Sequence, residues 1–236
     1  MKTITQHITE RLQLNRDRVQ KIKYEYFPET KGELLDNIKT ILKKHVDINE
    51  TNSDKVPVDL NIIDTSKITD MSELFMGIGA YHERFNYDVS QWYVGHVTNM
   101  RAMFYGCHNF NCDLSSWNTS EVRNTICMFY DCQKFEGKGL RYWDLSSVRT
   151  MRAMFSRCTV FNEDISRWDI SSCEDLSIMF CDCKKFNQDI SQWDVSNVTN
   201  VEDIFRDAYN FDQDLTPWTT GSHISRRNIH IKKYIK

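Results

Sequence analysis

The chain is organised around the stretch Phe186-Asn-Gln-Asp-Ile-Ser-Gln-Trp-Asp-Val-Ser-Asn-Val-Thr-Asn-Val-Glu-Asp-Ile-Phe205. Near-copies of this stretch recur from residue 57 to residue 218. All six tryptophans belong to the series, and the spacings between them are 25, 26, 25, 25 and 25 residues. One unit of this length cannot bury its apolar side chains alone, so each unit must stack on its neighbours. The period therefore predicts a repeat solenoid.

Two kinds of segment alternate within the unit. The segment Asp-Ile-Ser-Gln-Trp has the β-branched and aromatic residues of a short strand. The apolar residues between Val198 and Phe205 have the spacing of a short helix or 3₁₀ turn. We predict an α/β repeat solenoid, a stack of about seven coils with a parallel strand ladder and an α-helical N-terminal cap. The expected strands lie near residues 59–64, 88–93, 113–118, 140–144, 164–169, 189–194 and 214–219.

Two insertions interrupt the period. Phe75 and the next repeat phenylalanine, Phe104, lie 29 residues apart, which places an insertion in the glycine-containing loop 76–84. We expect this loop to bulge from one side of the stack. Gly137 and Gly139 mark a one-residue insertion in the fourth unit. The repeated phenylalanines, tryptophans and methionines are predicted to form core layers.

The sequence divides into three parts. Residues 1–56 are predicted to form a helical N-terminal cap, residues 57–218 the solenoid, and residues 219–236 a basic C-terminal tail or cap. In the first part we expect a short helix over about 3–13 and a second helix over about 30–45. Thr30-Lys-Gly-Glu33 fits a capping box at the start of the second helix. The apolar face of that helix is expected to cover the open end of the first coil.

Charge is unevenly distributed along the chain. Residues 57–218 contain 14 Lys and Arg against 24 Asp and Glu, a balance of −10, and residues 219–236 contain 5 against none. An acidic body argues against nucleic-acid binding along the solenoid, because phosphate contacts need a positive surface. The basic tail is expected to be a solubilising end or to fold back on the acidic body, and attraction of an anion is the alternative.

The sequence also predicts a compartment. The first residues contain no apolar stretch typical of a signal peptide, and no run of 18 apolar residues predicts a membrane span. The eight cysteines are therefore expected to remain thiols in a reducing compartment. A cytoplasmic location is the expectation, either in a cell or in the host cytoplasm of a virus.

The repeat resembles a known family. The unit Trp-Asp-Val-Ser-Asn-Val-Thr-Asn-Met-x-x-Met-Phe-x-x-Cys-x-x-Phe-Asn-x-Asp-Ile-Ser is similar to the BspA-like leucine-rich repeats, over residues 59–218. Such repeats are known from bacterial surface proteins and from viral and phage genomes. The resemblance implies a curved, leucine-rich-repeat-like solenoid that binds other macromolecules and has no enzymatic activity. Surface members usually carry a signal peptide and an anchor, and neither pattern is recognised in this sequence. An intracellular or virus-borne role is therefore left open.

Two sets of repeated residues are candidates for metal chemistry. Cysteine follows the repeat phenylalanine by three residues in four units, and alanine replaces it at Ala208, so the position is predicted to need a small buried side chain. Aspartates form one column three residues after a phenylalanine and another directly after tryptophan. We expect them to accept backbone hydrogen bonds in Asx turns, with calcium binding between coils as the alternative. No cofactor is predicted.

The residues just before the tryptophans are the predicted partner-binding positions. They should point away from the core on the strand face, and they are Gln91, Ser116, Arg141, Tyr142, Arg167 and Gln192. Arg and Tyr are common anchors of protein interfaces, so Arg141, Tyr142 and Arg167 are the preferred contacts. The histidines share no repeat position and no catalytic motif is present, so we do not expect an enzyme.

These observations predict a non-enzymatic module that binds another protein through the strand face and the insertion loop. One alternative is a structural or assembly component, such as a virion or surface protein, which an open last coil would favour. Another is an adhesin-like binder of glycans or proteins, which exposed tryptophans would favour. The repeated tryptophan period argues that these rings are buried.

Overall fold

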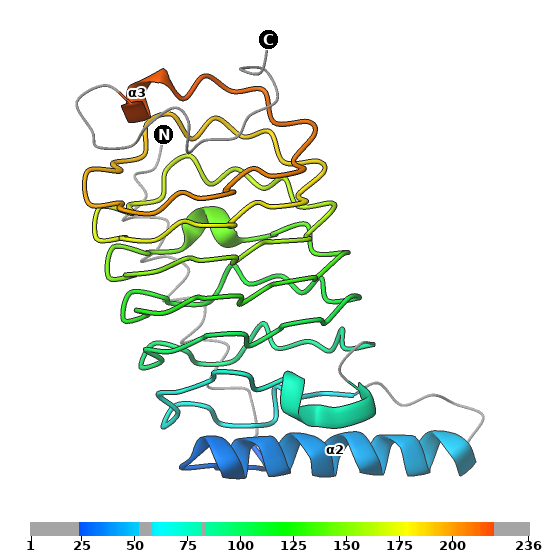
Figure 1. Cartoon of the computed structure of the whole chain (residues 1–236). Helices are drawn as coiled ribbons and strands as arrows, with labels where there is room; N and C mark the ends of the chain where they lie inside the picture. Colours follow the sequence, from blue (N-terminus) through cyan, green and yellow to red (C-terminus); the bar gives the residue numbers. More distant parts are fainter. Residues whose placement is uncertain (1–23, 52–57, 82–83, 220–236) are drawn as a thin grey trace, which may run out of the picture.

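The computed structural model describes residues 24–51, 58–81 and 84–219. These residues form a stack of coils, with helix α2 (Lys31–Thr51) across one end and the short helix α3 (Thr216–Thr219) in the last coil (Figure 1). Two 3₁₀ helices, η1 (Met76–Tyr81) and η2 (Leu140–Tyr142), interrupt single coils. The helix predicted over 3–13 lies outside the described residues, and so does the basic tail apart from its first residue.

Helix α2 confirms the helix predicted over about 30–45 and continues beyond it to Thr51. At its start, Thr30 Oγ1 accepts a hydrogen bond from the backbone N–H of Glu33 (3.2 Å), and the Glu33 carboxylate accepts one from the N–H of Glu29 (2.7 Å). The buried side chains of α2 belong to the same apolar core as the first coil, and they are Leu34, Ile38, Ile41 and Leu42. The helix therefore closes this end of the stack. No helix in the described part of the chain is both long and apolar enough for a bilayer crossing.

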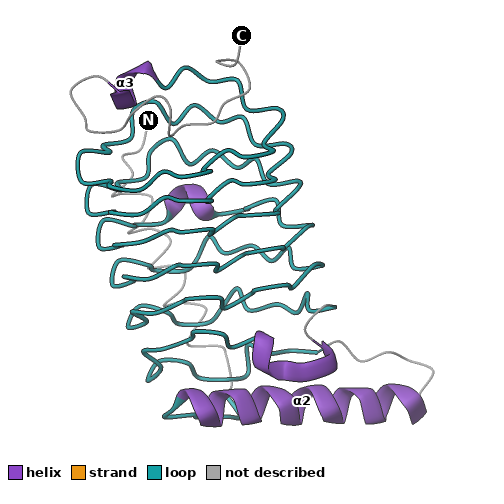
Figure 2. Cartoon of the chain, in the orientation of Figure 1, coloured by secondary structure: helices purple, strands orange, loops and turns teal. Residues whose placement is uncertain are grey.

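The predicted α/β solenoid with a parallel strand ladder is wrong. The described residues contain no β-strand and no sheet, so the coils are drawn as loops apart from their short helices (Figure 2). None of the seven predicted strands forms. Residues 59–64 make only isolated bridges, to Tyr26 and Asp88, while residues 140–144 contain η2 and residues 214–219 contain α3.

Regular contacts between coils lie instead on the segment that leads into the repeat phenylalanine. Isolated parallel bridges join successive coils at Asp70, Asn99, Asn124, Thr150, Asp175 and Asn200. From each bridge onward, every second backbone N–H group donates a hydrogen bond to a backbone carbonyl of the next coil. For example, Ala153 donates to Ser177 O (2.9 Å) and Phe155 to Met179 O (3.1 Å). We call these segments the bridge segments, and they comprise residues 69–77, 98–106, 123–131, 149–157, 174–182 and 199–207.

Left-handed residues explain why a bridge segment is neither helix nor strand. In the segment 149–157, φ is 53° at Ala153 and 63° at Arg157, and most other bridge segments repeat both positions. A residue with positive φ ends a right-handed helix and an extended strand alike. The apolar spacing from Val198 to Phe205 therefore reflects tight turns, such as the one closed by the 3.2 Å bond from Ile204 N to Val201 O. The expected helix does not form there.

Aromatic columns fill the interior, as the repeats predict. The first column has ring centroids 5.0–5.9 Å apart in neighbouring coils and consists of Phe75, Phe104, Phe129, Phe155, Phe180 and Phe205. A second column, with spacings of 5.6–6.4 Å, consists of Phe85, Phe110, Phe135, Phe161, Phe186 and Phe211. Burial of each ring contributes about 1.5–3 kcal/mol to the free energy of unfolding, so these columns make a large contribution to stability.

The insertion at 76–84 lies beside the closed end of the stack. Helix η1 occupies most of its described residues and packs next to α2 (Figure 1). Gly79 interrupts η1 with φ 66° and ψ −132°, a conformation open to glycine and strained for other residues. The insertion thus adds to the cover over the first coil.

Candidate functional site

The six candidate contact residues lie in a column of turns, each just before a tryptophan. We call them the pre-tryptophan row: Gln91, Ser116, Arg141, Tyr142, Arg167 and Gln192. Arg141, Arg167 and Gln192 are exposed, and the other three are half-buried. The strand face that was expected to carry them is absent from the described residues, so the row belongs to turns that side chains hold in place.

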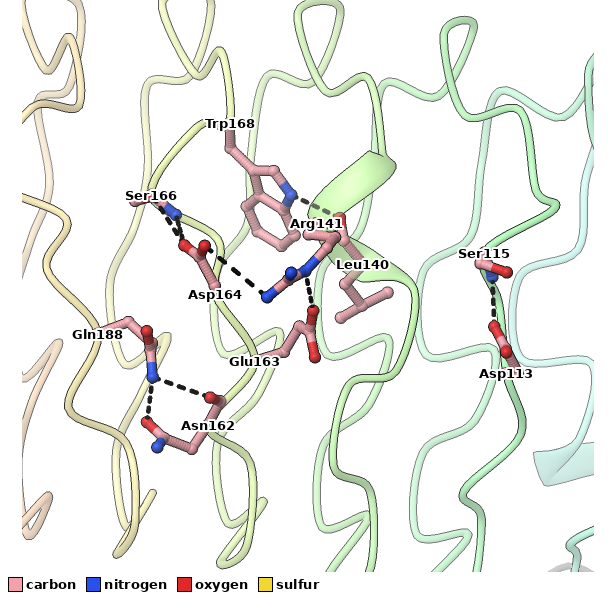
Figure 3. A network of polar contacts seen from close by, with 10 residues as sticks. All are labelled: Asp113, Ser115, Leu140, Arg141, Asn162, Glu163, Asp164, Ser166, Trp168 and Gln188. Atoms are coloured by element: carbon pink, nitrogen blue, oxygen red, sulfur yellow. Dashed lines mark hydrogen bonds and ion pairs between the residues drawn. The ribbon is translucent and has the colours of Figure 1, made fainter. Parts of the chain in front are cut away.

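Aspartates and tryptophans build these turns. Asp164 Oδ1 accepts a hydrogen bond from the backbone N–H of Ser166 (3.1 Å), and Asp113 Oδ1 accepts one from Ser115 (2.9 Å; Figure 3). The same Asx turn recurs in the other coils at Asp88, Asp189 and Asp214, and after tryptophan at Asp144, Asp169 and Asp194. The Asx turns predicted from the sequence are therefore confirmed. A third set at the bridge residues, including Asp70 and Asp175, was missed.

Each tryptophan joins its coil to the preceding one. The indole Nε1 of Trp168 donates to the backbone carbonyl of Leu140 at 2.8 Å (Figure 3). All six tryptophans make the equivalent bond, at 2.8–3.2 Å, and all six rings are buried. Each turn that carries a residue of the pre-tryptophan row is therefore anchored on its C-terminal side by a buried tryptophan ring.

Arg141 is already paired within the stack. Its Nε donates to Glu163 Oε1 (2.5 Å), and its Nη2 lies 3.8 Å from Asp164 Oδ2 (Figure 3). The hydrogen bond with Glu163 raises the pKa of Arg141 above its ordinary value, against the effect of burial. In the same coil, Lys138 Nζ lies 3.0 Å from Asp113 Oδ2. This coil has lysine where its neighbours have aspartate, so it neutralises carboxylates on both sides.

Two glycines allow this coil to fit between its neighbours. Gly137 and Gly139 have φ of 89° and 94°, in the left-handed region. A Cβ on Gly139 would lie 2.3 Å from the backbone nitrogen of Ser115, and one on Gly137 would lie 2.4 Å from the Phe161 ring. The one-residue insertion predicted from the sequence is therefore accommodated by backbone that passes close to both adjacent coils.

The remaining members of the row differ in how they are engaged. The Ser116 hydroxyl donates to the carbonyl of Ser90, and the side-chain amide of Gln192 donates to Ser191 Oγ (3.2 Å). Arg167 is exposed, and its positive charge acts on the carboxylate of Asp164. The Ser166 hydroxyl, together with the charges of Arg141 and Arg167, holds the pKa of Asp164 below its usual range. Arg167 is therefore the cation of the row that is best placed for a partner.

The cysteines have a structural role. Cys132, Cys158 and Cys183 are buried, and their thiols donate to carbonyls of the preceding coil, as Cys158 does to Phe129 O at 2.9 Å. Burial raises the pKa of the Cys158 thiol. The described cysteines form no disulfide. Among the described residues, no three His, Cys, Asp or Glu side chains converge as a metal site would need.

One family model matches the chain twice. Its description is "Mycoplasma protein of unknown function, DUF285", and the matches cover residues 46–142 and 136–233. Neither a curated protein nor a solved structure matches. The two matches divide the chain near the fourth coil, where the glycine insertion lies.

Proposed function

We propose that this chain, which belongs to the family described as Mycoplasma protein of unknown function, DUF285, is a non-enzymatic module that binds another protein through side chains exposed on its coils. The resemblance of the repeats to BspA-like leucine-rich repeats supports this function, since those repeats bind other macromolecules. We place the protein in the cytoplasm of a cell or of the host of a virus.

The division of roles within each coil supports a binding function most directly. The repeated residues serve the frame: phenylalanines and tryptophans pack the interior, aspartates close the turns, and thiols and indoles join coils. The outward positions change from coil to coil, from Ser116 to Arg141 and Tyr142 and then Arg167. A rigid frame with variable outward side chains is the arrangement with which repeat proteins recognise partners.

Within the pre-tryptophan row, we propose that Arg167 and Tyr142 are the principal contacts. A partner carboxylate could pair with Arg167, whereas pairing with Arg141 would first require the loss of its bond with Glu163. Exposed arginine beside a half-buried tyrosine is a composition typical of interface anchors. Gln91, Ser116 and Gln192 would then line the rim of the contact.

An assembly role is the alternative, and it depends on whether the last coil exposes apolar rings. Phe205, Phe211 and Trp218 are 3%, 5% and 1% exposed, against 0–4% for their counterparts in the middle of the stack. End-to-end stacking of copies would therefore gain little from burying these rings. The adhesin-like glycan alternative needs exposed tryptophans, and all six are buried.

A quantitative pull-down with the purified chain as bait tests the proposal. We expect a protein partner that wild type and the control variant Lys39→Glu retain and that Arg167→Glu loses. Lys39 is also an exposed cation but lies in helix α2, outside the coils and the insertion loop. Equal recovery by Arg167→Glu and wild type would contradict the proposed surface. A defined oligomer in light scattering over a concentration series would favour the assembly role instead.

A further inference from the structure

A second surface, outside the pre-tryptophan row, carries an unusual concentration of positive charge. The bridge segments 98–106, 123–131 and 149–157 contain five exposed arginines and two half-buried tyrosines. We call this set the arginine patch, and its members are Arg101, Arg123, Arg149, Arg152, Arg157, Tyr105 and Tyr130. The patch lies within residues 57–218, whose formal net charge is −10, so its positive charge is local.

Backbone register brings these residues together. The N–H of Arg149 donates to the carbonyl of Arg123 (3.0 Å), so these two residues occupy equivalent places in adjacent coils. The N–H of Cys127 donates to the carbonyl of Arg152 (2.9 Å). Burial raises the pKa of the Cys127 thiol, while the charges of Arg101 and Arg152 oppose this shift. Cys127 thus lies between arginines from the coils on either side.

The tyrosines form the apolar part of the patch. The rings of Tyr105 and Tyr130 stack with centroids 4.7 Å apart and an interplanar angle of 5°. The guanidinium carbon of Arg157 lies over the Tyr130 ring, 5.8 Å from its centroid. This cation–π contact holds Arg157 beside the tyrosine pair without using the hydrogen-bond donors of its guanidinium group.

Three of the five guanidinium groups have no carboxylate partner among the described residues. Arg101 pairs with Glu73, and Arg149 pairs with Glu174 at 3.2 Å. Arg123, Arg152 and Arg157 are exposed and make no ion pair with any described residue. Of the nine other cations of the repeat body, five pair with a described carboxylate, as Lys138 and Arg206 do. The patch therefore offers donors that the stack itself does not use.

We infer that the arginine patch is a docking surface for an acidic segment of another protein. Carboxylates of that segment pair with Arg123, Arg152 and Arg157, and an aromatic or aliphatic side chain between them packs against the edges of the stacked Tyr105 and Tyr130 rings. Charge complementarity selects such a partner, because a guanidinium group binds a carboxylate through two parallel hydrogen bonds. Arginine and tyrosine are also the residues most enriched at the energetic centres of protein interfaces.

The surroundings of the patch favour a peptide over a nucleic acid. Asp131 lies in one of these bridge segments, and Glu73 and Glu174 lie in the bridge segments on either side of the patch. All three carboxylates would repel a continuous phosphate backbone. Tyr130 has Tyr105 stacked against it and Arg157 over its ring, so it offers no open face for a base. A peptide can place carboxylates only where the unpaired arginines lie, and it avoids this repulsion.

Selection from a random peptide library displayed on phage tests the inference. The wild-type chain is the target, and the variant Arg123→Gln/Arg152→Gln/Arg157→Gln is used for counter-selection. A matched control, Lys39→Gln/Lys43→Gln/Arg84→Gln, removes three exposed positive charges elsewhere. We expect peptides enriched in Asp and Glu with an aromatic or aliphatic residue between them. Their affinity, measured by fluorescence anisotropy, should fall at least about tenfold for the patch variant and less than about twofold for the control.

Several results would overturn the inference. Selected peptides without an excess of carboxylates, equal affinity for wild type and the patch variant, or equal loss in the control would each exclude this surface. Tighter binding of a mixed-sequence single-stranded oligonucleotide than of any selected peptide would assign the patch to nucleic acid. Urea unfolding of all three proteins establishes that they are equally folded, and the single variant Arg152→Gln provides the measurement if the triple variant is not. Because Arg167 is unchanged throughout, the outcome is independent of the pre-tryptophan row.

Discussion

The bridge segment and the tryptophan turn of each coil are joined to neighbouring coils by different atoms. In the bridge segment, backbone pairs with backbone, as in the bond from Cys127 N to Arg152 O. In the tryptophan turn, side chains make the main connections, as in the bond from the Trp168 indole to Leu140 O. Aspartates close these turns by accepting backbone N–H groups, as Asp164 does. The turn therefore depends on particular side chains.

This difference explains which residues repeat. Tryptophan and aspartate recur because few backbone hydrogen bonds connect the turns of adjacent coils. Where the backbone makes the connection, the outward side chain is free to change, and the residue before the bridge is Thr98, Arg123, Arg149, Glu174 or Thr199 in successive coils. The residues that recur most regularly in the repeat therefore belong to the structural framework. Side chains specialised for contacts lie on the segment whose outward residues vary. The arginine patch lies on that segment.

The largest effect is expected where a turn passes closest to its neighbour. Gly139→Ala would place a Cβ 2.3 Å from the Ser115 nitrogen at a φ of 94°. We expect a loss of about 3 kcal/mol or more in the free energy of unfolding, measured by urea denaturation. The control Gly32→Ala lies in helix α2 with its nearest atom 3.8 Å away, and it should stabilise by about 0.5–1 kcal/mol. Similar results for the two variants would show that close approach does not constrain this turn.

Removal of one side-chain connection should have the next largest effect. Trp168→Phe keeps an aromatic ring but removes the indole donor to Leu140 O and leaves unfilled volume in the core. We expect a loss of about 2 kcal/mol in the free energy of unfolding. A cost below about 0.5 kcal/mol, which is typical of a surface change, would mean that the indole bond does not hold the coils together.

Acid should weaken the tryptophan turns through their aspartates. The backbone N–H and hydroxyl of Ser191 lower the pKa of Asp189, and the hydroxyl and N–H of Ser196 lower that of Asp194. Because the folded pKa is below the unfolded value of about 3.9, this stability is complete above that pH and is lost as the pH falls through the folded pKa. The urea concentration at the midpoint of unfolding, measured from neutral pH down through these pKa values, should decrease as the pH decreases. The decrease should be smaller in the variant Asp189→Asn/Asp194→Asn. An unchanged slope in the variant would contradict the role of these carboxylates.

The smallest effect on stability is expected in the bridge segments. Arg123→Gln and Arg152→Gln should each change the free energy of unfolding by less than about 0.5 kcal/mol, because the coil contacts there are made by backbone atoms. Urea denaturation of each variant at neutral pH provides the measurement. A loss above about 1 kcal/mol, the size of an ordinary intramolecular hydrogen bond, would show that these side chains contribute to the frame, and the comparison between the two segments would fail.

Several features could be predicted from the sequence because they depend on local chemistry or on the period alone. Thr30 and Glu33 start helix α2 with side-chain caps, and the aromatic spacing places the phenylalanine and tryptophan columns in the core. The Asx turns follow from the short reach of an aspartate to the N–H two residues later. The outward position of Arg141 and Arg167 also follows from their place before a buried tryptophan.

Only the tertiary structure decided where the backbone pairs and which charges meet. An apolar spacing such as that from Val198 to Phe205 suits a helical turn and a tight turn with a left-handed residue equally, and the choice depends on whether an adjacent coil accepts the N–H groups. The first of the two left-handed positions in the bridge segment is occupied by Ala, Cys, Ile, Asp or Glu in different coils, so no residue type signals it. Likewise, the pairing of Arg141 with Glu163, 22 residues away, and the juxtaposition of Arg123 with Arg149 arise from stacking register, which no single unit contains.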